Sequence, residues 1–221
     1  MSARVLDLDV VPEERDVLRL LGHREGETRI EAPMRRLIAE QIRRGPSLIR
    51  PRVALCAVDA PSRFGSARVF ERVERLVLGI ATIGPDLETE AERMVEAKEL
   101  AAALVLDAYG SAAVEAAAVR ANAIVCEEAD AESLVAGRRL SPGYPRWPID
   151  QQAALFAEVG GRAIDVALNE SFVMTPRKSI SFGVPLGRDL DAESPELGCR
   201  FCPMASCAYR RHAPTALRDA S

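Results

Sequence analysis

Two short, continuous apolar runs constrain the fold of this chain more than any other feature. They are RVALCAVDA at residues 52–60 and LVLGIATIG at residues 76–84. Apolar runs of this length, rich in branched side chains and without a polar face, are typical of buried β-strands. We therefore expect two buried strands here, and the patterns of the flanking segments decide which class of fold contains them.

The N-terminal segment predicts one strand and two helices. Residues 4–11, RVLDLDVV, alternate apolar and acidic side chains, as an edge strand does. A short helix should follow, opened by Pro12 and stopped near Gly22. A second helix, APMRRLIAEQIRRG at residues 32–45, carries four arginines. These arginines form either a solvated helix face or a docking surface for an acidic partner.

A long helical pattern extends from residue 85 to residue 129, which is too long for one uninterrupted helix in an ordinary domain. We expect breaks near Glu99 and around Gly110. An interior glycine costs a helix about 1 kcal/mol relative to alanine, so Gly110 should allow close approach of either another helix or a ligand. Glu115 lies among alanines and a valine, and a carboxylate near a buried face needs a partner.

The C-terminal half predicts one more helix and a pair of strands. IDQQAALFAEVGG reads as a short helix capped by Asp150 and stopped at Gly160. Residues 162–187 then alternate apolar and polar side chains around a turn at residues 176–178, which predicts strand, turn and strand. With helices clustered in the middle and antiparallel strands at the end, the fold class is α+β.

Composition and charge narrow the function classes. The chain has 221 residues, of which 48% are hydrophobic and 28% charged, the balance of a folded globular protein. We expect one domain over residues 1–192 and a cysteine-rich tail over residues 193–221. The net charge of −4 argues against a nucleic-acid binder. We find neither a signal peptide nor a membrane span in the sequence, so we expect a cytoplasmic protein.

The tail holds three of the five cysteines. Cys199, Cys202 and Cys207 have the spacing C-x2-C-x4-C, and His212 follows five residues later. Thiolates at this spacing can close on one metal, and three cysteines with a fourth ligand suit zinc or an iron–sulfur cluster. A redox-active thiol set and cysteines without any ligand stay open as alternatives.

A stiff aromatic and cationic loop, RRLSPGYPRWP, occupies residues 138–148. Its three prolines, Pro145 among them, fix φ and remove backbone donors, which holds Gly143 and Tyr144 in a presented conformation. Arg139 offers a bidentate partner for a carboxylate, and Tyr144 offers a flat face and a hydroxyl group. The loop therefore suits a small zwitterionic ligand with an aromatic ring, or else forms a structural proline corner.

Two segments together carry a resemblance to a known family. RLSPGYPRWP, followed by a helix and by LNESFVMTPRKSISFGVPLG, resembles the activation domain of cobalamin-dependent methionine synthase, whose signature is R-x-x-x-G-Y-P and then a T-E-S-F-like segment. The small-residue stretch LDAYGSAAVEAAA is similar to a helix of that family, and the cysteine tail resembles its free-standing, single-domain members. The resemblance covers roughly residues 75–210.

The resemblance implies a binding site for S-adenosylmethionine. By position, Arg139 would pair with the methionyl carboxylate, and the backbone of Gly143, Tyr144 and Pro145 would hold the adenosyl group. Glu115 aligns with an acid that lies near the ligand in the family. The acidic, aromatic-rich segment that helps to bind the ligand's amino group in the longer synthases has no counterpart that we can find here; Asp7 or Asp9 is a candidate substitute.

The function implied is that of a methyltransferase-type reactivation subunit, which supports the reductive methylation of inactive cob(II)alamin to methylcobalamin. We find no D-x-H-x-x-G cobalamin-binding motif in the sequence, so the cobalamin is expected on a partner, a methionine synthase or a related corrinoid protein, with a separate electron donor. The alternative is a metal-binding accessory or scaffold protein of the same fold without this chemistry. Methylation of another acceptor is disfavoured, because no Rossmann-type glycine-rich turn is evident.

Overall fold

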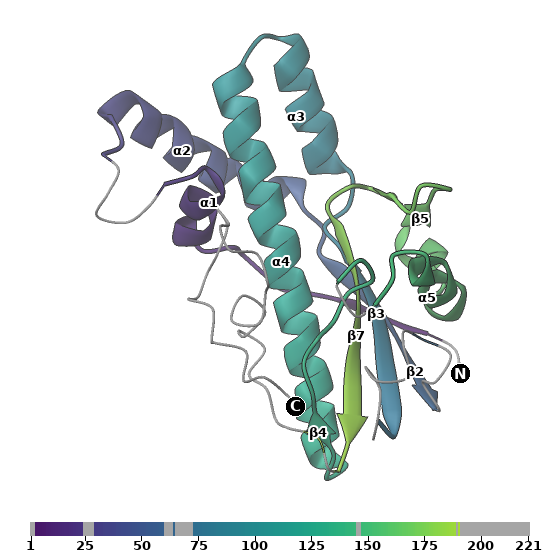
Figure 1. Cartoon of the computed structure of the whole chain (residues 1–221). Helices are drawn as coiled ribbons and strands as arrows, with labels where there is room; N and C mark the ends of the chain where they lie inside the picture. The colour runs from purple at the N-terminus through teal and green to yellow at the C-terminus, as the bar shows by residue number, and fades with distance from the viewer. Residues whose placement is uncertain are drawn as a thin grey trace, which may run out of the picture.

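The computed structural model describes residues 3–23, 29–59, 64, 73–144, 147–188 and 190 (Figure 1). They form an α+β fold with a five-stranded antiparallel sheet, as the sequence predicts. The strand order is β1-β2-β3-β7-β4. The bounds are β1 Arg4–Asp7, β2 Arg52–Asp59, β3 Arg75–Thr82, β4 Val135–Ala136 and β7 Ser179–Gly187.

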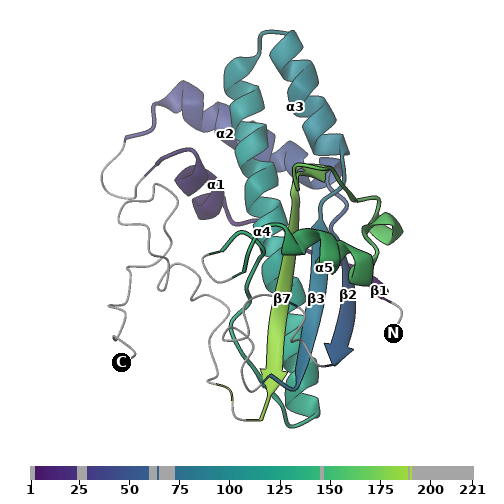
Figure 2. The same cartoon turned by 45° about the vertical axis from the view of Figure 1, so that its right-hand side comes forward.

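Five α-helices pack on and beside this sheet. Their bounds are α1 Glu14–Leu20, α2 Ala32–Arg44, α3 Asp86–Glu96, α4 Leu100–Ala131 and α5 Gln151–Val159, with short 3-10 turns at Gly45–Leu48 and Gly161–Ile164. In Figures 1 and 2, α4 runs along one face of the sheet, α5 lies on the other, and the α3–α4 hairpin extends beyond the end of the strands.

The two predicted central strands are buried on both sides because each face carries its own apolar layer. On one face, alternate residues of β2, β3 and β7 pack against the alanines and valines of α4. On the other face, the intervening residues pack against α5 and Trp147, which is fully buried. These strands do not alternate apolar and polar residues, because neither face of the sheet is exposed to solvent here.

The helical segment after residue 85 breaks once. Lys98 adopts φ 65°, and Glu99 N–H donates to the Met94 carbonyl at 2.9 Å. These contacts form a Schellman-type end for α3, so the predicted break near Glu99 is confirmed. The predicted break around Gly110 is wrong, because α4 is continuous there. A Cβ at Gly110 would meet Leu87 Cδ2 of α3 at 2.6 Å, so the glycine serves close helix packing.

The C-terminal strands differ in part from the prediction. The turn at residues 176–178 does precede β7, but β7 pairs with β3 and β4 and not with the segment before the turn. That segment forms a separate two-stranded sheet from β5, Ala167–Leu168, and β6, Met174–Thr175. Gly160 ends α5 in the left-handed conformation, as expected, whereas the Asp150 side chain makes no capping hydrogen bond.

The long helix α4 is central to the fold and is also apolar. By length and composition it passes as a helix that could cross a membrane, but 67% of its most apolar window is buried within the protein. A core helix of this kind gives the same signal. The predicted division at residue 192 and the cysteine tail lie outside the described residues.

Candidate functional site

The proline-rich loop contains a tight turn at Ser141–Tyr144. Tyr144 N–H donates to the Ser141 carbonyl at 3.1 Å, and Gly143 has φ +93°. Proline at the second position and a positive-φ residue at the third are the signature of a type II turn. The turn is closed further by Gly143 N–H donating to the Trp147 carbonyl at 2.7 Å. The local backbone thus holds Gly143 and Tyr144 in a fixed turn, as the sequence predicts.

Two contacts anchor this turn to the edge of β7. Leu140 and Gly183 exchange two backbone hydrogen bonds, of 2.9 and 2.8 Å. Trp147 packs over Gly183, where an added Cβ would lie 2.8 Å from the indole ring. A tryptophan that is fully buried contributes several kcal/mol of packing. Tyr144, by contrast, is 50% exposed at the tip of the turn.

Arg139, which precedes the turn, forms an ion pair with Glu115 of α4. Arg139 Nη2 donates to Glu115 Oε1 at 2.8 Å, and the guanidinium carbon lies 5.8 Å from the centroid of the Phe182 ring. The two side chains are 17% and 35% exposed, respectively. The predicted partner for Glu115 is therefore Arg139, and the two residues singled out separately in the sequence form one polar centre.

One donor of Arg139 lacks a partner. Its Nη1 atom is buried and makes no hydrogen bond to any described residue. A buried guanidinium donor without an acceptor is costly, and a ligand carboxylate would satisfy it through a charge-assisted bond. Glu115 offers a second oxygen for a cationic group in the same place. The centre can therefore bind a molecule that carries both charges, such as an α-amino acid.

A second polar contact lies on the same face of α4, toward its N-terminus. Lys178 Nζ pairs with Asp107 Oδ1 at 2.7 Å and donates to Ser111 Oγ at 2.8 Å. Sequence reasoning missed this group, although Asp107, Ser111 and Glu115 are spaced four residues apart and therefore share a helix face. Its contacts join the start of β7 to α4.

The sequence also suggests Asp7 or Asp9 as a partner for the ligand's amino group. Asp7, a candidate for the ligand's amino group, lies in β1 at the opposite edge of the sheet from the loop, and Asp9 follows it along the chain. A role for either residue in binding the ligand's amino group stays a prediction.

Four predicted residues fall outside the described part of the chain. They are Pro145 and the three tail cysteines, Cys199, Cys202 and Cys207. Within the described residues, no group of three or more histidine, cysteine or acidic side chains could hold a metal ion. The predicted metal site therefore stays a prediction.

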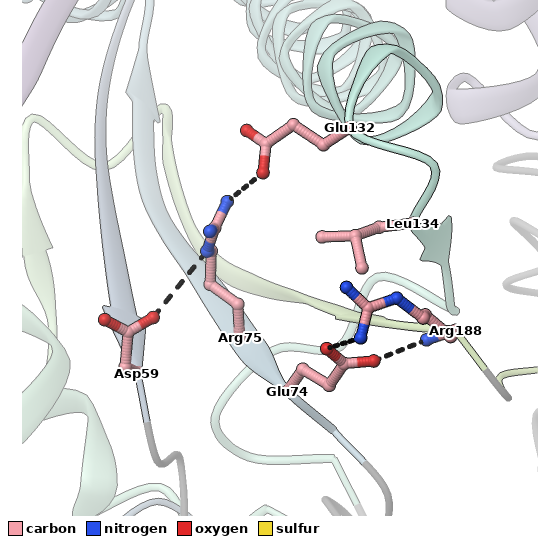
Figure 3. Close-up of a pocket in the computed structure, with 6 residues that line it drawn as sticks. All are labelled: Asp59, Glu74, Arg75, Glu132, Leu134 and Arg188. Atoms are coloured by element: carbon pink, nitrogen blue, oxygen red, sulfur yellow. Dashed lines mark hydrogen bonds and ion pairs between the residues drawn. The ribbon is translucent and has the colours of Figure 1, made fainter.

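A charged cavity of about 210 Å³ lies at the far end of the sheet (Figure 3). Arg75 Nη1 bonds Glu132 Oε2 at 2.6 Å, and Arg75 Nε lies 3.7 Å from Asp59 Oδ1. Arg188 Nη1 lies 3.2 Å from Glu74 Oε2. The hydrogen bond that Arg75 donates to Glu132 raises the pKa of Arg75. Each arginine already has a carboxylate partner, so neither guanidinium group is left unpaired for an anionic ligand.

Comparisons with known proteins give one kind of match. No protein-family model matches the chain, and no curated protein sequence does. Among solved structures, the chain is similar to the crystal structure of the MetH reactivation domain bound to AdoHcy, with a TM-score of 0.64 and 13% sequence identity. The match covers 88% of this chain and 81% of that one. The chain thus has the fold of a methionine synthase reactivation domain.

Proposed function

We propose that this chain binds S-adenosylmethionine and acts as a reactivation subunit for cobalamin-dependent methionine synthase or a related corrinoid methyltransferase. The observation that carries the proposal is the half-buried Arg139–Glu115 centre, with its unsatisfied Arg139 donor, at the edge of a sheet with the reactivation-domain fold. The structural neighbour binds AdoHcy, the demethylated product of S-adenosylmethionine.

The charges of the centre match those of the ligand. The methionyl carboxylate would accept from Arg139, whose Nη1 atom has no other acceptor among the described residues. The ammonium or sulfonium group would lie near Glu115, whose negative charge is already partly withdrawn from solvent. Since binding would replace one internal ion pair with two ligand ion pairs, the protein keeps no buried charge uncompensated.

The loop would contribute mainly by holding the ligand in a fixed position. The type II turn fixes the backbone of Gly143 and Tyr144, and the exposed Tyr144 ring offers an aromatic face at the tip of the turn. Holding the methyl donor at a fixed place converts a bimolecular encounter into an oriented one, which is where a positioning protein gains rate. No general base is required from the chain, because the methyl acceptor is itself the nucleophile.

The reaction balances with one external electron. The partner's cob(II)alamin takes up one electron and the methyl group of S-adenosylmethionine, the S–CH₃ bond breaks, and methylcobalamin and S-adenosylhomocysteine result. We assign the electron to a separate donor. The corrinoid is assigned to a partner protein.

The test is a reductive methylation assay under anaerobic conditions. The purified chain is mixed with a cobalamin-loaded methionine synthase fragment that lacks its own activation domain, a chemical one-electron reductant and methyl-labelled S-adenosylmethionine. We expect label transfer to cobalamin that depends on the chain and is lost with Arg139→Ala. Binding of S-adenosylmethionine without transfer would limit the chain to a binding role, and the absence of binding would favour the scaffold alternative.

A further inference from the structure

A cavity of about 460 Å³ lies where α2 meets the turn between α3 and α4, at the opposite end of α4 from the Figure 3 cavity (Figures 1 and 2). We call it the α2–α4 cavity. Leu37 of α2, Met94 of α3 and Leu100 of α4 form the apolar part of its wall. Its volume is typical of small-molecule sites. Glu115 lies about four turns further along α4, so this cavity is separate from the Arg139–Glu115 centre.

The first turn of α4 lines the α2–α4 cavity with free backbone donors. The N–H groups of Leu100, Ala101 and Ala102 have no acceptor among the described residues, and Glu99 makes no side-chain cap. The free N–H groups and the dipole of a helix N-terminus attract an anion. Lys98 lines the same cavity, and its ammonium group makes no ion pair with a described residue. A carboxylate bound here would therefore contact both N–H donors and a positive charge.

A buried amide group on the facing helix also lacks partners. Gln41 of α2 lines the α2–α4 cavity and is only 2% exposed. Its Oε1 atom is buried and accepts no hydrogen bond from any described residue, and its amino group donates none to them. Buried side-chain amides are nearly always hydrogen-bonded. A polar ligand in the cavity would complete the hydrogen bonding of Gln41, which is an indication of a ligand independent of the helix N-terminus.

The remaining charged residues of the cavity narrow the kind of ligand. Glu40 and Glu99 also line the cavity, and neither carboxylate forms an ion pair with a described residue. Arg44, the other charged residue of the wall, is already paired with Glu90. Two unpaired carboxylates would repel a simple anion, whereas an ammonium group beside a carboxylate would match both signs of charge. The apolar part of the wall adds a preference for an apolar side chain.

We propose that the α2–α4 cavity is a second binding site, which takes a free α-amino acid with an apolar side chain, such as leucine or methionine. The carboxylate of the amino acid accepts from the first N–H groups of α4 and from Lys98, and its ammonium group lies beside Glu40 and Glu99. The side chain packs on the apolar part of the wall. This inference does not rest on the proposed function, because the two sites share no residue.

Matched ligands test whether both charges are recognised. L-Leucine carries an ammonium and a carboxylate group, isocaproate lacks the ammonium group, and isopentylamine lacks the carboxylate. We expect L-leucine and L-methionine to bind the full chain in calorimetry, and each of the two leucine analogues to bind about tenfold more weakly or worse than leucine. The titrations are repeated with Arg139→Ala, because the Arg139–Glu115 centre also suits an amino-acid group. We expect that variant to bind leucine normally.

Variants of the cavity wall test where the amino acid binds. Lys98 has φ 65°, which glycine adopts freely, so Lys98→Gly removes the ammonium group without straining the turn. We expect Lys98→Gly and Glu40→Gln each to weaken leucine binding severalfold. Glu96→Gln, an exposed change in α3 outside the cavity, is the control and should bind leucine normally.

Three results would overturn the inference. They are no binding of either amino acid, equal binding of leucine and isocaproate, and leucine binding that is lost in Arg139→Ala but kept in Lys98→Gly and Glu40→Gln. Each of these leaves the proposed function standing, because S-adenosylmethionine binding at the Arg139–Glu115 centre is measured separately.

Discussion

Two of the protein's arginine–carboxylate clusters lie near different parts of α4, and they differ in the burial of their arginines and in whether a buried donor is left without an acceptor. In the Figure 3 cavity, Arg75 and Arg188 are paired with three carboxylates and are open to water. Beside the proline turn, Arg139 is 17% exposed, has one carboxylate partner and keeps one buried donor without an acceptor among the described residues. Arginine and carboxylate side chains therefore form a paired surface network in the cavity. Beside the turn they form a centre that can still bind a ligand carboxylate. The two clusters differ in the burial of their arginines and in the number of arginine donors without an acceptor, and they do not differ in the kinds of charged group that they contain.

The largest loss of ligand binding should come from removing Arg139, in comparison with removing Arg75. Arg139→Ala should weaken S-adenosylmethionine binding by about 100-fold or more, because two charge-assisted hydrogen bonds in a half-buried place are lost. Arg75→Ala is the matched control and should leave binding unchanged while costing less than about 1 kcal/mol of stability. Calorimetric titration measures S-adenosylmethionine binding by the two variants, and denaturant unfolding measures their stability. Equal losses in binding would remove the distinction between the clusters.

The carboxylate partner should matter less than the arginine. Glu115→Gln keeps a hydrogen-bond acceptor for Arg139 but removes the charge that faces the ligand's cationic group, so we expect about tenfold weaker binding. Asp107→Asn, one ion pair further along the same face of α4, serves as the control. A larger loss in Asp107→Asn than in Glu115→Gln would move the ligand toward Lys178.

The turn should contribute through its backbone. Gly143→Ala forces a side chain into φ +93° and brings Cβ to 3.3 Å from Ile149 Cδ1, which should cost about 1 kcal/mol of stability and weaken binding severalfold. Gly22 also has a positive φ, +82°, but has open space around it and lies far from the loop in the sequence. Gly22→Ala should therefore show the loss in thermal unfolding without the loss in calorimetric binding. A Gly143→Ala variant that binds normally would mean that the ligand does not contact the turn.

A third arginine–carboxylate cluster gives the smallest effect and a pH signature. Hydrogen bonds from Arg93 and Arg44 lower the pKa of Glu90 to about 2. Because this folded-state pKa lies below the ordinary value of 4.5, the contribution to stability is present above pH 4.5 and is lost as the pH falls toward 2. Glu90→Gln should lower stability at neutral pH by about 1 kcal/mol or less and flatten the acid limb. Denaturant unfolding at several pH values measures it, and an unchanged acid limb would contradict the pairing.

These features differ in how far the sequence could foretell them. The buried strands and the turn residues Pro142 and Gly143 were predictable, because apolar runs and proline–glycine pairs constrain local backbone directly. The continuous course of α4 through Gly110 was not, because it depends on Leu87 of a different helix. Glu115 and Arg139 were each recognisable as candidates, yet their mutual pairing depends on how α4 and the loop pack.

We propose that the Arg139–Glu115 centre beside the turn, and not the charged cavity, binds the ligand. A crystal structure of the chain with S-adenosylhomocysteine tests this most directly. We expect to find the ligand carboxylate within hydrogen-bonding distance of Arg139 Nη1, with the ligand's amino group beside Glu115. A ligand found between Arg75 and Arg188, with the Arg139–Glu115 pair unchanged, would contradict it.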